Sequence, residues 1–360
     1  MSFSNQIAEL AVERGIALGD GAIENVAMLE KRWGEVEFEL KFEITECCDL
    51  RCSFCHQEFG KRKKLGEDFP FDDYCCIIDA AKREKEIKYI RITGGEPTLH
   101  PQVKDFLRYA VDEGFRTILN TNAVHLTQEK IAELAPYVGT WKVSLPAADE
   151  AGTDAVTGVP GTWRGKIAAL EVLRRQKCNV DLLIVMTPQN IDDIPKFLAL
   201  AKKYRATYTF LRQESSASNR RPLTCEHIEH LLSVLEKTQS QLGLAIPFCA
   251  TGDMARIASL ADGRVGCGPY SSLVVKADRT VHHCYSRRVS RKAGLFLATA
   301  VWMAAEDFID LPEPCRECAY GASCLGGCRC GFALRNSPVG PIDYLADFEH
   351  KHIYPSGERG

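Results

Sequence analysis

The sequence predicts an α/β fold in which a parallel sheet curves into a partial (β/α)6 barrel, followed by a small cysteine-rich C-terminal domain. Two observations predict it. Six strand-like segments alternate with helix-like segments between residues 36 and 246, and ten of the sixteen cysteines fall into two groups. Strands that alternate with helices form parallel sheets. Active sites of such folds lie at the C-terminal ends of the strands.

Short apolar runs mark the six strands. The first, residues 36–45 (VEFELKFEIT), places apolar side chains at every second position, as a strand with one buried face does. The others are predicted at residues 89–93, 116–120, 141–145, 180–186 and 207–211. The first strand leads directly into a cysteine-rich loop, which therefore lies at the edge where an active site is expected.

Helices are predicted where apolar residues recur at helical spacing. Residues 101–113 show this spacing, and Gly114 ends the segment. Further helices are predicted at residues 128–134, 162–176, 194–204 and 224–243. The pattern then changes to short elements rich in Gly and Cys, which places a boundary near Pro247. We therefore expect an N-terminal helical segment (1–35), a barrel (36–246) and a cysteine-rich domain with a C-terminal tail (247–360).

The composition is that of a soluble globular protein. The chain has 360 residues, with 45% hydrophobic residues, 26% charged residues and a formal net charge of −3. This charge gives no polybasic footprint for nucleic acid. The first ten residues lack the features of a signal peptide, and the most apolar segment, residues 293–305, is too short to span a bilayer. We expect a cytoplasmic protein with no nucleic-acid or membrane partner.

The stretch ECCDLRCSFCHQE carries three closely spaced cysteines. Cys48, Cys52 and Cys55 are separated by three and two residues. Disulfides are a poor explanation in a reducing cytosol. A structural zinc site takes four ligands, and a [4Fe–4S] cluster usually does too. Three cysteines on one loop would leave one iron of a cluster open to another molecule, with structural zinc or a disulfide as the alternative.

Two further features accompany this loop. Phe54 precedes the third cysteine, and Gly94-Gly95-Glu96-Pro97 ends the second strand. Together with the cysteine loop, these residues resemble the radical S-adenosylmethionine (radical SAM) superfamily over about residues 36–215. The resemblance implies that the three cysteines hold a [4Fe–4S] cluster. Its open iron would chelate the amino and carboxylate groups of SAM.

The resemblance also implies a reaction. An electron, delivered by a flavodoxin or ferredoxin type donor, would cleave SAM to methionine and a 5′-deoxyadenosyl radical. This radical would abstract a hydrogen atom from the substrate, while the protein positions SAM and excludes water. The SAM-binding residues implied by the resemblance are Phe54, Gly94, Gly95, Glu96, Pro97, Asn122, Ser144 and Arg164.

These residues would have different tasks. Backbone groups of residues 94–96 would bind the methionyl amino group, and Phe54 would lie near the adenine. Ser144 matches a polar residue on the fourth strand that reaches SAM in relatives, although a turn or capping role is the alternative for Ser144 and for Asn122. In some relatives an arginine near the position of Thr157 pairs with the SAM carboxylate, and Arg164 is a possible substitute. Ala123 stands where glycine is common in the family.

A second cysteine pattern lies near the C-terminus. It resembles the SPASM extension of radical SAM enzymes, which carries two auxiliary [4Fe–4S] clusters, and residues 295–303 (LFLATAVWM) resemble its short apolar helix. The resemblance implies that Cys267, Cys284 and Cys328 hold the first auxiliary cluster, and that Cys315, Cys318, Cys324 and Cys330 hold the second. A zinc ribbon is the alternative, but seven cysteines exceed one four-ligand site.

This extension departs from the family pattern in two places. Arg279 stands where the family usually has glycine, and Cys330 follows Cys328 by only two residues. Either Cys330 completes the second cluster in an altered geometry, or another ligand does so. His350 and His352 are candidates for that ligand, with a solvated tail as the alternative for both.

Cys249 precedes the extension and has three possible roles. It is a fourth ligand of the first auxiliary cluster, a hydrogen-atom donor to a substrate radical, or an inert buried thiol. Its place directly before the cluster-binding region favours the ligand.

The length of the N-terminal segment bears on the substrate. Only about 35 residues precede the first strand, too few for the peptide-binding domain that several SPASM enzymes carry. This favours a small polar substrate (a sugar, aminoglycoside or nucleoside) in natural-product biosynthesis. The alternatives are radical modification of a ribosomally made peptide, and an iron–sulfur electron carrier or sensor without SAM chemistry. Arg212, Gln213 and Glu214, after the sixth strand, either face the substrate or lie on the surface.

Overall fold

The computed structural model describes most of the chain up to residue 324. The described residues are 2–35, 37–55, 68–212, 223–240, 256, 259–260, 272–277, 279–282, 296–311, 313–319 and 321–324. The chain divides into two compact units. One contains residues 37–213 and 273–292, and the other contains residues 1–36, 214–272 and 293–360. Within the described part, no helix is both long and apolar enough to cross a membrane.

The first unit is built on one sheet. Its six parallel strands are β1 (Phe38–Glu43), β2 (Ile87–Thr93), β3 (Arg116–Thr121), β4 (Thr140–Ser144), β5 (Val180–Met186) and β6 (Thr207–Arg212). The strand order is β6-β5-β4-β3-β2-β1-β7-β8, so a short antiparallel pair, β7 (Ser272–Val275) and β8 (Val281–His282), extends the sheet beside β1. Each strand from β1 to β6 lies beside the next one along the chain.

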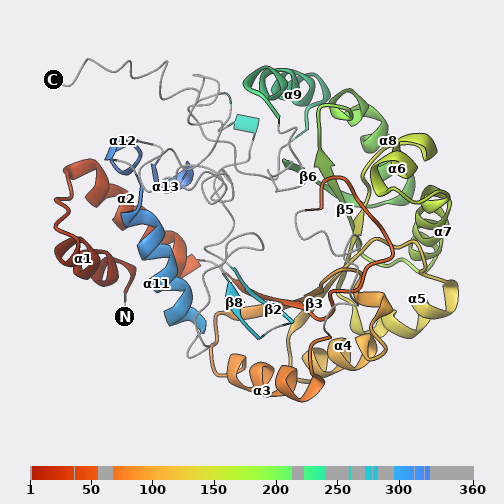
Figure 1. Cartoon of the computed structure of the whole chain (residues 1–360), viewed down its shortest axis with the longest axis horizontal. Coiled ribbons are helices and arrows are strands. Elements are labelled where there is room, and N and C mark those ends of the chain that lie inside the picture. Colours follow the sequence, from red (N-terminus) through yellow and green to blue (C-terminus); the bar gives the residue numbers. More distant parts are fainter. Residues whose placement is uncertain are drawn as a thin grey trace. The chain divides into compact units, whose positions relative to one another are not determined.

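Helices follow the strands and lie outside the curved sheet, as Figure 1 shows. They are α3 (Phe71–Ala81), α4 (Val103–Asp112), α5 (Gln128–Leu134), α6 (Glu150–Thr157), α7 (Thr162–Arg175) and α8 (Ile194–Tyr204), with 3-10 turns η2 (Pro97–Leu99), η3 (Ala135–Tyr137) and η4 (Ile191–Asp193). The predicted α/β fold with a partial (β/α)6 barrel is therefore confirmed.

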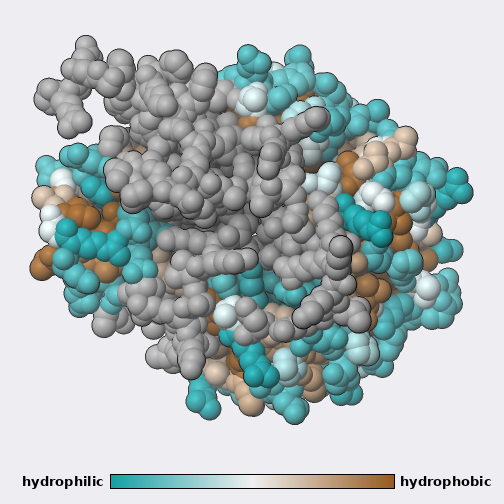
Figure 2. Space-filling model, in the orientation of Figure 1, coloured by the Kyte–Doolittle hydropathy of each residue, from teal (hydrophilic) through white to brown (hydrophobic). Residues whose placement is uncertain are grey.

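The strands carry the core of this unit. Phe42, Ile90, Leu119 and Trp141 are fully buried. Each such side chain contributes about 1.5–3 kcal/mol when it leaves water. Hydrophilic residues dominate the outward faces of the surrounding helices on the side shown in Figure 2. The sheet thus provides a rigid base for the loops at the C-terminal ends of its strands.

Most predicted bounds of the barrel elements lie within two residues of the observed ones, but the helix predicted at residues 224–243 ends earlier, at Thr238. Residues 128–134, 180–186 and 194–204 form α5, β5 and α8 with the predicted ends. β1 ends two residues earlier than predicted, and Thr45 instead forms an isolated antiparallel bridge with Asp68. β7 and β8 have no counterpart among the predicted elements, because four- and two-residue strands are too short to show a period.

The second unit contains α1 (Phe3–Glu13), α2 (Asp20–Glu35), α9 (Cys225–Thr238), α11 (Phe296–Ile309), α12 (Glu313–Arg316) and α13 (Gly321–Cys324). The N-terminal helices share one buried apolar cluster with α11, in which the rings of Phe3 and Phe308 lie 6.4 Å apart in an edge-to-face arrangement. The apolar helix predicted at residues 295–303 is present as α11, which continues to Ile309.

Candidate active site

The cysteine loop leaves β1 and is held against α6 through its backbone. The N–H of Arg51 donates to the Thr157 carbonyl at 2.8 Å, and the N–H of Ser53 donates to the Val156 carbonyl at 2.9 Å. A turn follows, closed by the N–H of Cys55 and the carbonyl of Cys52 at 3.1 Å. These bonds fix the path of the loop at the C-terminal edge of the sheet, where the sequence predicted it.

The thiols of this loop are partly buried, and burial changes their acidity. Desolvation raises the pKa of Cys48 to about 12 and that of Cys52 to about 11. For Cys52 the positive charge of Lys166 acts in the opposite direction. Thiolates are therefore unfavourable here without a compensating positive charge, as metal ligation would supply.

The Gly-Gly-Glu-Pro motif packs directly on the start of the cysteine loop. The N–H of Gly95 donates to the Thr45 carbonyl at 2.8 Å, and the N–H of Glu96 donates to the Cys47 carbonyl at 2.7 Å. Gly94 has a φ of +145°, and a Cβ atom there would lie 2.3 Å from the Thr45 oxygen. A Cβ atom on Gly95 would lie 2.1 Å from the Cys47 oxygen. Only glycine permits this approach.

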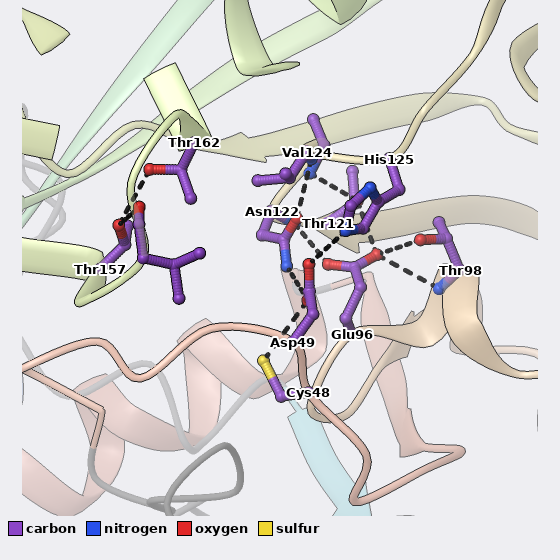
Figure 3. Close-up of polar contacts among 12 residues, drawn as sticks. Cys48, Asp49, Glu96, Thr98, Thr121, Asn122, Val124, His125, Thr157 and Thr162 are labelled. Atoms are coloured by element: carbon purple, nitrogen blue, oxygen red, sulfur yellow. Dashed lines mark hydrogen bonds and ion pairs between the residues drawn. The ribbon is translucent and has the colours of Figure 1, made fainter. Parts of the chain in front are cut away.

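The buried Glu96 carboxylate connects this motif to the end of β3, as Figure 3 shows. It accepts hydrogen bonds from the N–H of Thr98 (3.2 Å), the hydroxyls of Thr98 (2.6 Å) and Thr121 (2.7 Å), and the N–H of Asn122 (2.6 Å). Burial raises the pKa of Glu96, and these four bonds lower it. The carboxylate thus holds two strand ends in register.

Asp49 makes a second connection between the cysteine loop and the end of β3. The side-chain amide of Asn122 donates to Asp49 Oδ1 at 2.7 Å, and His125 Nε2 lies 3.2 Å from Asp49 Oδ2 (Figure 3). Asp49 was not among the residues selected from the sequence, nor was His125. They lie 76 residues apart, and no local pattern joins them.

Lys166 is a buried cation at the same edge of the sheet. It is only 1% exposed, and its Nζ donates to the carbonyls of Asn122 (2.6 Å) and Ser144 (3.0 Å). Burial lowers its pKa to about 8, while nearby acidic groups, Cys52 first, raise it. Lys166 therefore joins α7 to the ends of β3 and β4. A lysine in an amphipathic helix ordinarily lies on the solvated face, so the sequence pattern did not identify Lys166 as a site residue.

The remaining predicted SAM-binding residues lie around this edge. Phe54 is in the turn of the cysteine loop, Pro97 is the buried first residue of η2, and Ser144 ends β4. Arg164 is well exposed and pairs with Glu150 at 2.8 Å. Thr157, near the position of the relatives' arginine, is fully buried and donates its hydroxyl to the Thr153 carbonyl at 2.8 Å.

Both departures from a family glycine fall at left-handed backbone positions. Ala123 has a φ of 62° and Arg279 has a φ of 64°. Glycine adopts such angles without steric cost, and other residues do so at about 1–2 kcal/mol. The backbone geometry expected of the family is therefore present at both positions, with a residue that fits it less easily.

Only part of the predicted auxiliary cluster region lies within the described residues. Cys315 and Cys318 are described, and Cys324 ends α13 without a described side chain; Arg212 ends β6 in the same way. Outside the described residues lie Cys249, Cys267, Cys284, Cys328, Cys330, Gln213, Glu214, His350 and His352.

The donor set of the cysteine loop fits a [4Fe–4S] cluster, because Cys48, Cys52 and Cys55 are free thiols on one loop and each could bind a different iron. No group of three or more His, Cys, Asp or Glu in the described ranges is arranged to hold one ion. Asn120 Oδ1 is also buried at the end of β3 without a partner among the described residues, as a polar group that contacts a bound molecule would be.

Comparison with known proteins identifies the same segment. The sequence model of the radical SAM superfamily matches residues 42–201. A mycofactocin maturase, MftC, of Mycolicibacterium smegmatis is 29% identical over an alignment of 314 positions, which covers 80% of this chain and 77% of the relative. A PqqA peptide cyclase of Bradyrhizobium diazoefficiens is 23% identical over an alignment of 363 positions, which covers 92% of this chain and 93% of the relative.

Solved structures agree on the fold. Streptococcus suis SuiB bound to S-adenosylmethionine superposes with a TM-score of 0.67 at 17% identity, covering 89% of this chain and 80% of that one. SuiB bound to its precursor peptide SuiA gives a TM-score of 0.64 at 16% identity, covering 95% of this chain and 88% of that one.

Proposed function

From the match of residues 42–201 to the radical SAM superfamily and the similarity to the maturase MftC, we propose that the chain is a radical SAM enzyme of the SPASM type that modifies a ribosomally made peptide by radical chemistry. Enzymes of this superfamily use a [4Fe–4S] cluster and SAM. When bound, a cluster reduced by an external electron donor would supply the one electron needed to cleave SAM to methionine and a 5′-deoxyadenosyl radical, which would take a hydrogen atom from the substrate.

The chain's own residues hold and orient these groups. Cys48, Cys52 and Cys55 are the proposed cluster ligands. The amino group of SAM requires acceptors, and the N–H groups of Gly95 and Glu96 already donate to the cysteine loop. We therefore assign the contact with the amino group to the carbonyl oxygens of Gly94 and Gly95.

Other residues would orient the rest of SAM. Phe54 and Ser144 keep their proposed contacts with adenine and with SAM, while Asn122 is positioned by Asp49 and Glu96. Arg164 remains the proposed partner of the SAM carboxylate. Its ion pair with Glu150 is exposed and contributes little free energy in water. Arg164 could therefore leave Glu150 for the SAM carboxylate at a small cost in free energy.

The proposed substrate class rests on the similar proteins. One is named as a peptide cyclase, and SuiB was solved with a precursor peptide. They support the peptide alternative rather than the small polar substrate that the short N-terminal segment favoured. We propose in addition two auxiliary clusters in the C-terminal region and a flavodoxin or ferredoxin type electron donor, with Arg212, Gln213 and Glu214 facing the substrate.

Two assays test the proposal in sequence. Anaerobically reconstituted protein, reduced with dithionite, should convert SAM to 5′-deoxyadenosine, and the Cys52→Ala variant should not. The chain should then be co-expressed with short open reading frames that neighbour its gene, and the peptides examined by mass spectrometry. A mass change that requires Cys52 supports peptide modification. Turnover of aminoglycosides or nucleosides, with every neighbouring peptide unchanged, would instead support the small polar substrate.

A further inference from the structure

The segment between Cys315 and Cys318 forms hydrogen bonds with two helix ends. Its two central residues are Arg316 and Glu317. Arg316 donates to the carbonyls of Ile309 (3.0 Å) and Leu311, at the C-terminal end of α11. A cation at a helix C-terminus satisfies orphan carbonyls and opposes their partial negative charge.

Glu317 contacts a helix end of the opposite sign. Its carboxylate accepts from the N–H groups of Gly19 (3.3 Å) and Ala22 (3.2 Å), at the start of α2. An acidic group is favourable at a helix N-terminus. Both residues between the cysteines are therefore used to dock the turn, one on α11 and one on α2.

Asn25 of α2 adds a third contact that spans the whole cysteine segment. The side chain is 3% exposed, and its amide donates to the carbonyls of Arg316 (2.6 Å) and Cys318 (3.1 Å). Its Oδ1 accepts from the N–H of Ala322 at 2.8 Å, in the first turn of the helix that ends at Cys324. One side chain thus relates the turn that bears Cys315 and Cys318 to the helix that bears Cys324.

Glycines allow α2 to come this close. A Cβ atom on Gly21 would lie 2.8 Å from the backbone oxygen of Glu317. A Cβ atom on Gly321 would lie 2.6 Å from Asn25 Nδ2 and 2.8 Å from the Cys315 oxygen. At Gly21, α2 therefore packs directly against the backbone of the cysteine segment, with no room for a side chain at that position.

We propose that Asn25, with Glu317, is a positioning residue that holds Cys315, Cys318 and Cys324 in the geometry that binds the second auxiliary cluster. This role rests on the proposed assignment of these three cysteines to one cluster. It gives the N-terminal segment a function in cluster retention, which no motif within residues 1–35 indicates. Asn25 acts through hydrogen bonds to the backbone around the cysteines and does not touch iron.

The test measures iron retention in the full chain. In a Cys48→Ala, Cys52→Ala, Cys55→Ala background, reconstituted protein should hold about eight irons, all auxiliary. Asn25→Asp keeps the shape but removes both donors, so about four irons should leave about tenfold faster into EDTA. The electron paramagnetic resonance signal of one auxiliary cluster should change with it. Asn5→Asp, on the exposed side of α1, makes the same charge change and should have no effect.

The outcomes are separable. Circular dichroism at the assay temperature establishes that each variant is folded, and Glu317→Gln, which keeps its shape, should accelerate iron loss in the same direction by a smaller factor. An unchanged release rate and spectrum in folded Asn25→Asp would overturn the role of Asn25. If the background protein binds no iron, the assignment of auxiliary clusters is refuted, and with it the role of Asn25. SAM cleavage by the unaltered chain would still support the proposed function in that case.

Discussion

The carboxylate of Glu96 accepts a hydrogen bond of 2.6 Å from the backbone N–H of Asn122, which fixes the motif after β2 to the end of β3. Glu96 also accepts from two hydroxyls and a second N–H, so every one of its four partners is a donor in this arrangement. A side chain that places an N–H group at this position cannot replace the Glu96 carboxylate.

Glu96→Gln should therefore be destabilising. The new amide places N–H groups against donors, and we expect the free energy of unfolding to fall by about 1–3 kcal/mol. SAM cleavage should fall at least about tenfold because the strand ends shift. Urea denaturation and a 5′-deoxyadenosine assay measure the two effects. Glu86→Gln, an exposed change before β2, is the control; equal behaviour of the two variants would contradict the prediction.

Gly95→Ala should abolish SAM cleavage. The added Cβ atom would lie 2.1 Å from the Cys47 carbonyl oxygen, so the backbone before Cys48 must move. We expect a loss of about 1–3 kcal/mol in unfolding free energy, as for other overpacked sites. Gly114→Ala is the matched control, because Gly114 has a φ of +90° but no atom within 4 Å of the added Cβ. It should be destabilised yet still cleave SAM.

Reconstituted protein should contain about three [4Fe–4S] clusters, or roughly twelve irons per chain. Replacing Cys48, Cys52 and Cys55 together by Ala should remove about four irons and all SAM cleavage, while the other irons stay bound. Iron analysis and absorption spectra of both proteins check this. Four irons in the unaltered protein would refute the auxiliary clusters and leave the radical SAM cluster standing.

The stability of the protein should depend on the protonation of His100. Burial lowers the pKa of this residue, while Asp68 opposes the shift, and its Nδ1 accepts from the N–H of Gln102 at 3.1 Å. Because the folded pKa lies below the unfolded 6.5, this contribution is present above pH 6.5. It is lost as the pH falls from 6.5 through the folded pKa, since the unfolded chain takes up the proton first.

His100→Asn keeps an acceptor for Gln102 but does not titrate in this range. Urea denaturation at pH 7.5 and 5.5 should show a larger loss for the unaltered protein, by at most about 1.4 kcal/mol per pH unit. Equal losses in the two proteins would exclude His100 as the source of the acid sensitivity.

Cys249→Ala should separate the two active roles of that cysteine. As a cluster ligand, its loss should lower bound iron and alter the auxiliary-cluster spectrum, which is the outcome we expect from its place before the cluster-binding region. As a hydrogen-atom donor, its loss should leave iron unchanged and give 5′-deoxyadenosine without normal product. Normal iron, spectrum and turnover would return it to an inert thiol.

The barrel could be predicted from the sequence because its signals are local. β5 and α8 were predicted with their observed bounds, since the apolar run of β5 and the helical period of α8 are each complete within the segment. The cysteine loop and the Gly94–Gly95 turn were also identified in place, because their chemistry depends on residue type and spacing.

The supporting residues could not be predicted in this way. Lys166 is buried only because α7 packs on the ends of β3 and β4, where a Cβ atom on Gly165 would lie 2.5 Å from the Val124 oxygen. Asp49 meets Asn122 and His125 because the parallel strands β1 and β3 deliver their following loops to the same edge of the sheet. Such contacts arise from tertiary packing, which the residue pattern of a single sequence does not reveal.

The helices α1 and α11 contact each other but emerge from the ribosome at very different times. Arg14 pairs with Asp310, 296 residues later. At roughly 5–20 residues per second, synthesis would separate the emergence of these partners by about 15–60 seconds. During that interval the apolar face of α1, with Phe3, Ile7 and Leu10, has yet to meet Phe308. Until α11 emerges, this apolar face of α1 is open to aggregation, and holdase chaperones are expected to bind there.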